Sequence, residues 1–245
     1  MRLDKVLEQQ QVGSRKAVRR LFQRGLVCVN NQIVREEGFN VEPALHTVVV
    51  AGKQLDFTGH AYFMLNKPQG VVTAVKDSEH TTVIDLIRAE ERTPKLYPVG
   101  RLDRDTEGLL LITDNGQLGY ELMHPEKKVV KRYEVVVNGA LDEVDYQRFA
   151  EGITFIGGEQ CQEAELTILT SSPEESHAYL DIKEGKFHQV KKMFLSVGKK
   201  VVFLKRLSMG PLSLTTELAP GMYRRLNASE LKLLMPYFET KNRDE

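Results

Sequence analysis

The sequence predicts an α+β fold with two parts: a small αβ module, then a larger domain built on a mixed, mainly antiparallel sheet with flanking helices. Short apolar strands outnumber the helical stretches and interleave with them irregularly, and no segment repeats at a fixed period. Periodicity is also lost around residues 55–60. We therefore expect the first module at 1–58, a linker at 59–61, the larger domain at 62–238 and a polar tail at 239–245.

The first module is expected to contain two helices and a hairpin. Residues 4–10 form a short amphipathic stretch, and Ser14 is a good N-cap for a second helix that ends near Arg24. Two short apolar runs within residues 26–34 flank an Asn-Asn pair that is typical of a hairpin turn, and residues 48–50 supply a further strand. These elements make a compact αβ unit.

The second helix of this module has a basic exterior. Its apolar residues share one face, and the remaining positions carry five basic side chains without an acid, namely Arg15, Lys16, Arg19, Arg20 and Arg24. A second acid-free basic block runs from Lys186 to Arg206, although the whole chain has 34 Lys plus Arg against 34 Asp plus Glu. One such block alone would be read as a solvated helix face. Two blocks in a neutral chain indicate a localised phosphate-binding surface.

In the larger domain, strands and helices are predicted from periodicity, caps and turn residues. Strands are expected over residues 62–65, 71–75, 109–113, 131–137, 164–169, 177–182, 201–204, 212–214 and 223–226. Helices are expected over residues 82–88, 117–123, 142–150, the stretch after Gly185 to Phe194, and 228–238 with Asn227 as its cap.

Composition excludes several classes of protein. With 41% hydrophobic residues, no apolar run of membrane length and no apolar core of a secretion signal, the chain is expected to be cytoplasmic and away from membranes. Cys28 and Cys161 offer no disulfide framework, and neither has a ligand-spaced partner for zinc. Glycine-rich nucleotide loops and a serine nucleophile elbow are also missing from the sequence. We therefore expect no metal and no cofactor.

Residues 99–113 are the most informative stretch. Two arginines and two aspartates, Asp103 and Asp105, lie between glycines and directly precede an apolar run long enough for a buried strand. A half-buried aspartate is costly unless a cation holds it, so this turn suggests a fixed, reactive carboxylate. A surface turn with an Arg/Asp pair explains the stretch equally well when it is taken alone.

Two resemblances extend this interpretation. Arg2-Leu3-Asp4-Lys5, Ser14-Arg15 and Gly25-Leu26-Val27 with the following hairpin resemble the S-four-like RNA-binding module of a ribosomal protein and of tyrosyl-tRNA synthetases. The segments 62–70, 100–111 and 184–193 resemble, in the same order, the motifs of bacterial ribosomal small-subunit pseudouridine synthases of the RsuA type. The second resemblance covers essentially the whole chain. It implies the pseudouridine synthase fold and isomerisation of a uridine in RNA without metal or cofactor.

The resemblance also implies roles for individual residues. Asp103 matches the essential aspartate, which attacks the sugar C1′ or, in a competing account, the base. Tyr133 matches the tyrosine that packs on the flipped base, and Lys191 the basic partner of the aspartate. Arg101 matches a side chain that helps to fill the gap left by the flipped base. Substrate-binding residues are expected at Arg101, Lys67, Lys186, His188 and Gln189. Taken alone, Tyr133 would be a core strand residue and Lys191 a surface lysine.

The expected partner is 16S rRNA or a small-subunit assembly intermediate, bound by a monomer with no protein partner. Related enzymes with the same motifs act on large-subunit (23S) rRNA, which stays an alternative. A non-catalytic RNA-binding assembly factor would share the basic helix but leaves Asp103, Tyr133 and Lys191 unexplained. An S-four-like module fused to an rRNA methyltransferase is disfavoured because the chain lacks a glycine-rich cofactor loop.

Overall fold

The computed structural model describes residues 1–238, which divide into two compact units. The first contains Met1–Ala61 together with residues 226–238, and the second contains Tyr62–Arg225. The domain bounds expected from the sequence stay a prediction, and the polar tail expected at 239–245 lies outside the described residues. Within the described residues, no helix has the length and apolar character needed to cross a membrane.

The first unit is an antiparallel sheet with short helices. Its elements are α1 (Leu3–Gln9), α2 (Arg15–Gln23), β1 (Val27–Val29), β2 (Gln32–Ile33), β3 (Val48–Val50), β4 (Lys53–Leu55), α6 (Ala228–Leu233) and α7 (Met235–Phe238). The strands lie in the order β2-β1-β3-β4. The Ser14 hydroxyl caps α2 by accepting from the Ala17 amide, and the Asn227 side chain caps α6. The two helices and the hairpin expected in the first module are confirmed. The closing helix, expected over 228–238 in the larger domain, is divided in two and belongs to this unit.

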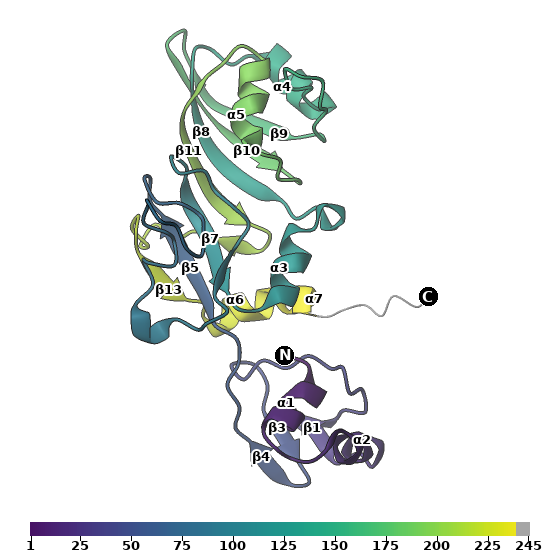
Figure 1. Cartoon of the computed structure of the whole chain (residues 1–245). Helices are drawn as coiled ribbons and strands as arrows, with labels where there is room; N and C mark the ends of the chain where they lie inside the picture. Colours follow the sequence, from purple (N-terminus) through teal and green to yellow (C-terminus); the bar gives the residue numbers. More distant parts are fainter. Residues whose placement is uncertain (239–245) are drawn as a thin grey trace. The chain divides into compact units, whose positions relative to one another are not determined.

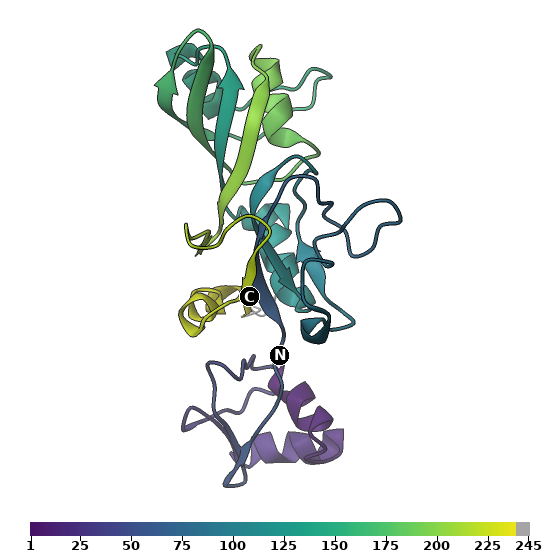
Figure 2. The same ribbon diagram turned by 90° about the vertical axis from the view of Figure 1, so that its left-hand side faces the viewer.

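The second unit is built on one large sheet (Figures 1 and 2). Its strands are β5 (Tyr62–Lys67), β6 (Tyr97–Val99), β7 (Glu107–Thr113), β8 (Lys131–Asn138), β9 (Glu165–Ser171), β10 (Glu175–Ile182), β11 (Val201–Met209), β12 (Leu212–Ser213) and β13 (Tyr223–Arg225). Its helices are α3 (Gly116–Met123), α4 (Glu143–Glu151) and α5 (Gln189–Ser196), with 3-10 turns at Ala89–Glu91 and Pro125–Lys127.

The strand order of this sheet is β13-β5-β7-β11-β8-β10-β9, with β6 added to β7 and β12 added to β11. Strands β7 and β11 pair in parallel, and every other described pair of the sheet is antiparallel. The predicted α+β class with a mixed, mainly antiparallel sheet is therefore confirmed. We call the β7–β11 pairing the parallel seam, because it joins the β5–β7 part of the sheet to the β8–β11 part.

Helices α4 and α5 cover one face of the β8–β11 part. Val190, Met193 and Phe194 of α5 and Phe149 of α4 belong to one buried apolar cluster with the inward residues of β8 and β10. The rings of Phe149 and Phe194 lie 4.8 Å apart, so the two helices pack on each other as well as on the sheet. Figure 1 shows α5 alongside these strands. This packing fixes the position of the residues at the start of α5.

The prediction of a strand over residues 71–75 is wrong. Only Val72 makes an isolated bridge, to Thr82, and the chain then bends. The bend occurs where the Thr73 hydroxyl donates to the Leu102 carbonyl over 2.7 Å and accepts from the Leu102 amide over 3.2 Å. A long-range side-chain bond therefore replaces the ladder that the apolar pattern favoured.

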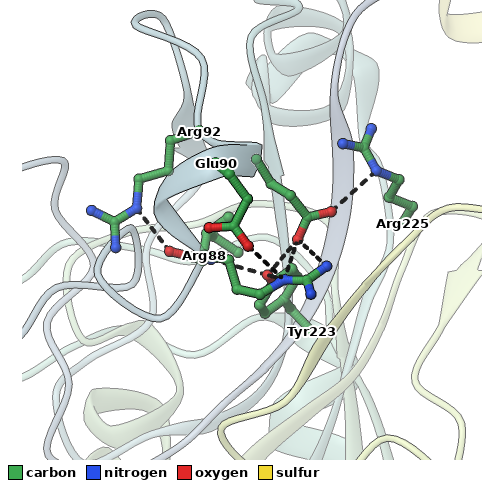
Figure 3. A network of polar contacts seen from close by, with 7 residues as sticks. Arg88, Glu90, Arg92, Tyr223 and Arg225 are labelled. Carbon is green, nitrogen blue, oxygen red and sulfur yellow. Dashed lines mark hydrogen bonds and ion pairs between the residues drawn. The ribbon is translucent and has the colours of Figure 1, made fainter.

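The prediction of a helix over 82–88 is also wrong, because the amides of Asp85 and Ile87 donate to the carbonyls three residues before them, which makes turns instead of an α-helix. The Arg92 guanidinium donates to the carbonyls of Ile87 and Asp85, over 2.7 and 3.0 Å. The segment is then tied to β13 through Glu91, whose carboxylate accepts from the Tyr223 hydroxyl over 2.6 Å and pairs with Arg88. Figure 3 shows this network, which packs the segment against the sheet edge.

Candidate active site

A cavity of about 380 Å³ opens in the second unit next to the parallel seam. Its size is within the range of small-molecule sites. Seven of the residues predicted from the sequence line it, and they come from three separate parts of the chain: Arg101, Asp103, Tyr133, Lys186, His188, Gln189 and Lys191. The fold therefore brings together nearly all of the expected catalytic and substrate-binding side chains.

Asp103 lies in the turn that joins β6 to β7, and this turn is held from both sides. Thr73 binds the backbone of Leu102, whose side chain is buried in the apolar cluster. On the other side, the Gly70 amide donates to the Arg104 carbonyl over 2.8 Å. A carboxylate on such a turn has a fixed direction, which is what a reacting group needs.

The Asp103 carboxylate is half-buried and paired. Its Oδ2 lies 2.9 Å from the Lys191 Nζ, and its Oδ1 lies 3.4 Å from Nε2 of His188. The same Lys191 ammonium also lies 2.6 Å from Oδ1 of Asp105. Lys191 is thus shared by two carboxylates, of which Asp103 lines the cavity and Asp105 does not.

The ion pair between Lys191 and Asp105 is accompanied by pKa shifts in both groups. Partial burial opposes the charge on Lys191, but its hydrogen bonds with Asp105 and Asp103 outweigh this and raise the pKa of the ammonium. The hydrogen bond from Lys191 lowers the pKa of Asp105. Lys191 therefore stays protonated at neutral pH and provides a fixed positive charge beside both carboxylates.

Tyr133 contributes the aromatic wall of the cavity. It is the third residue of β8, it is 7% exposed, and it pairs with Leu180 of β10 and Arg206 of β11 in the two ladders. Because β8 lies between two strands of a large sheet, the backbone that carries the ring is held in place. The expectation from periodicity that Tyr133 faces the core is compatible with the structure, since here the core borders the cavity.

Lys67 does not reach the cavity, although it was expected to bind substrate. It is fully buried at the end of β5, and its Nζ donates to the carbonyls of Pro68, Arg104 and Thr106, over 3.0, 3.3 and 2.9 Å. Burial lowers the pKa of this ammonium to about 8. The position assigns Lys67 to holding the Asp103 turn rather than to contact with a ligand.

Lys186 and Gln189 line the cavity but already have protein partners. The Lys186 ammonium donates to the Gln160 carbonyl over 2.6 Å and pairs with Glu159 over 3.0 Å. The Gln189 side chain is buried; its oxygen accepts from the Lys186 amide and its nitrogen donates to Glu184. Both side chains brace the loop before α5.

His188 has an unusual backbone at the cavity edge. Its φ of 52° lies in the left-handed region, which costs energy for a residue other than glycine and is concentrated at functional sites. Its ring stacks on the 62%-exposed Phe187 with centroids 3.8 Å apart. The strained conformation keeps the imidazole within reach of Asp103.

Three buried polar residues of the cavity were not predicted as site residues from the sequence, namely Thr106, Lys131 and Arg206. Lys131 lies two residues from Val129 and Tyr133, and Arg206 lies two residues after Leu204, so each cation shares a strand face with apolar or aromatic residues. This position on an inward face was the available signal. Basic blocks in a sequence usually lie on the protein surface. The sequence pattern therefore favours a phosphate-binding face, and it did not predict that these two cations are buried.

The predicted RNA-docking residues belong to the first unit. The five basic side chains of α2 are all exposed, while Val18 and Phe22 on the opposite face are buried in the apolar cluster of this unit. Arg19 is partly neutralised by Glu37 at 3.4 Å. The helix thus presents the basic face that the sequence predicted. Among the described residues, no group of three or more His, Cys, Asp or Glu side chains could hold a metal ion.

Comparison with known proteins places this geometry in context. A family model described as RNA pseudouridylate synthase matches residues 61–196, and an S4 domain model matches residues 1–45. The chain is 43% identical over 234 residues to the uncharacterized RNA pseudouridine synthase YtzG of Bacillus subtilis (strain 168), covering 96% of this chain and 98% of that protein. It is 38% identical over 233 residues to ribosomal small subunit pseudouridine synthase A of Escherichia coli (strain K12), with coverages of 94% and 98%. A solved crystal structure of a pseudouridylate synthase matches with a TM-score of 0.66 at 32% identity, covering 96% of this chain and 100% of that one.

Proposed function

The chain belongs to the RNA pseudouridylate synthase family and carries an S4 domain, and from this premise we propose that it isomerises one uridine of 16S rRNA. The substrate is the free RNA or a small-subunit assembly intermediate. The name of the Escherichia coli relative supports the choice of the small subunit. An enzyme with a ribosomal substrate works in the cytoplasm. Because the residues that line the cavity come from one chain, we propose that a monomer is sufficient for the reaction.

Asp103 is the nucleophile of this proposal, and the observation that carries it is the half-buried carboxylate at the cavity wall, 2.9 Å from the Lys191 ammonium. A carboxylate held in place by a neighbouring cation is competent to attack. Whether Asp103 adds to C1′ of the sugar or to the base, the N1–C1′ bond breaks and a C5–C1′ bond forms. The proton lost from C5 is balanced by one gained at N1, so the product is an isomer of the substrate.

Access to C1′ requires the target nucleotide to leave its stack, which costs a few kcal/mol. Tyr133 offsets part of this cost by stacking on the extruded base, since base–aromatic stacking contributes about 1–3 kcal/mol. Arg101 is exposed at the cavity and occupies the gap that the base leaves. The basic face of α2 neutralises phosphates elsewhere on the same RNA.

The test compares Asp103→Asn with Asp105→Asn. Both carboxylates pair with Lys191, but only Asp103 lines the cavity, so Asp105→Asn is the matched control. Each protein is incubated with unmodified small-subunit rRNA and with a partly assembled particle, and pseudouridine is mapped. We expect Asp103→Asn to form no product while it still binds RNA, and Asp105→Asn to keep most of its activity. Product formed by Asp103→Asn would refute the assignment of the nucleophile.

A second arm of the same experiment uses unmodified large-subunit rRNA. Pseudouridine in 23S rRNA alone would replace the proposed substrate and leave the role of Asp103 in place. A biological function retained in full by Asp103→Asn would instead favour a role in ribosome assembly that needs no catalysis.

A further inference from the structure

The inner wall of the cavity carries two cations that the proposed chemistry does not use. Lys131 is 3% exposed and Arg206 is 1% exposed, and both line the cavity together with Tyr133. The Arg206 Nε donates to the Leu109 carbonyl over 2.8 Å, but its Nη2 has no hydrogen-bond partner among the described residues. The Lys131 Nζ donates to the Val129 carbonyl over 3.1 Å, its one hydrogen-bond partner within residues 1–238. Several donors are therefore free to bind a ligand.

The sheet places both cations beside the Tyr133 ring. Arg206 of β11 is the ladder partner of Tyr133, and directly opposed residues project from the same face of a sheet. Lys131 precedes Tyr133 by two positions on β8, so its side chain also projects from that face. A flat ring stacked on Tyr133 thus has charged donors along its edge.

Such a wall costs free energy as long as its donors have no acceptor. A buried donor without a partner loses its hydration, and two cations on one wall repel each other. Burial, and then the charge of Arg206, lower the pKa of Lys131 to about 8. The buried hydroxyl of Thr106, also at the cavity, has no partner among the described residues either. A ligand that brings hydrogen-bond acceptors relieves this cost.

The burial of the cations decides which part of an RNA can reach them. A phosphodiester has chain on both sides and needs a groove that is open at both ends. A base hangs from a single bond and can enter a closed wall. The two carbonyl oxygens O2 and O4 lie at the two ends of one edge of uracil and are acceptors, whereas cytosine presents an amino donor at position 4.

Resting on the proposed function, we propose that Arg206 and Lys131 read the extruded base by donating hydrogen bonds to the carbonyl oxygens of uracil, and that they thereby select uridine against cytidine. In the same position, cytosine would place its amino group against one of the two cations. Both of these groups are donors, so neither would have a hydrogen-bond acceptor. A site built to hydrogen-bond a group rejects analogues that lack it far more strongly than an apolar pocket does. Selection by shape alone would not need buried charges.

The test combines protein variants with altered RNA. The substrate is an RNA fragment containing the uridine mapped for the wild type, with that uridine replaced by 2-thiouridine or 4-thiouridine, because sulfur is a weaker acceptor than oxygen. We expect each thio substitution to lower kcat/KM of the wild type about 10-fold. Lys131→Met and Arg206→Met should each lower kcat/KM for the normal RNA by about 10- to 100-fold, as expected for loss of a charged hydrogen bond. Each variant should also become insensitive to one of the two sulfurs.

Lys205→Met is the matched control, because Lys205 neighbours Arg206 on β11 but does not line the cavity. It should leave kcat/KM and both thio effects unchanged. Melting curves check that each variant folds, and the thio effects on the wild type test the proposal even if Arg206→Met does not fold. The base-reading role would be overturned if neither thio substitution changed kcat/KM of the wild type. It would also be overturned if a folded Lys131→Met had a normal kcat/KM. A wild type that makes no pseudouridine in any RNA would instead overturn the proposed function.

Discussion

Gly108 is the residue whose replacement should damage the second unit most for the smallest chemical change. It lies in the parallel seam, opposite Arg206, with a φ of +107°. An added Cβ would lie 2.2 Å from the Arg206 carbonyl oxygen and 2.6 Å from its amide nitrogen. Both are backbone atoms of β11, so no side chain can rotate away to make room.

The expected cost of Gly108→Ala has two parts. Placing an alanine at positive φ costs about 1–2 kcal/mol, and overpacking against a fixed backbone costs about 1–3 kcal/mol. The sum, roughly 2–5 kcal/mol, is a large part of the 5–15 kcal/mol that stabilises a typical domain. For a unit of this size it corresponds to a fall in Tm of roughly 4–20 °C.

Thermal and urea unfolding of the full chain measure this effect. Gly116→Ala is the control, because Gly116 heads α3, has no heavy atom within 4 Å of an added Cβ and lies in a helix where alanine is favoured. Its Tm should be unchanged or slightly higher. If Gly108→Ala melts within about 2 °C of the wild type, β7 and β11 can move apart at little cost and the steric argument fails.

Two further predictions concern Lys67 and helix α2. Since burial lowers the pKa of Lys67 from 10.5 to about 8, the folded protein binds fewer protons than the unfolded chain between these values. The share of the free energy of unfolding due to Lys67 therefore rises with pH across this window, by at most about 3 kcal/mol. Urea titrations from pH 7 to 10 should show a shallower rise for Lys67→Met than for the wild type, and equal slopes would contradict the burial of the charge. Replacing Arg15 and Arg20 together by Gln should weaken RNA binding and reduce the slope of log affinity against log salt by about 0.7–0.9 for each phosphate that the helix no longer neutralises. An unchanged slope would show that α2 does not meet phosphates.

Local patterns were a good guide wherever local forces decide. The caps Ser14 and Asn227 and the alternation of β10 predicted elements that the structure contains. The helix over 82–88 failed because the segment closes turns with bonds to the carbonyl three residues back, and the Arg92 side chain, several residues away, binds two of its last carbonyls. No propensity within that segment reports such an interaction.

The site was predictable to the extent that its residues stand in recognisable motifs. Asp103 and Lys191 were singled out and meet at one cavity. Arg206 was not, because a basic residue near other basic residues suggests a surface, and only the strand order shows that its neighbour is Tyr133. Lys67 was expected to touch substrate, since a lysine after a strand gives no indication that its side chain folds back under a turn.

The parallel seam also has a consequence for how the protein is made. It pairs Glu107 with Lys205, which are separated by about 100 residues, so its closure costs about 4 kcal/mol of chain entropy. At a synthesis rate of about 5–20 residues per second, β7 emerges from the ribosome roughly 5–20 s before β11. During that interval Glu107 and Gly108, the two residues of β7 that pair with β11, lack that partner, while β5 and β6 can already pair with β7. The cavity wall that carries Arg206 is therefore completed only after β11 emerges, when most of the β5–β7 part can already have formed.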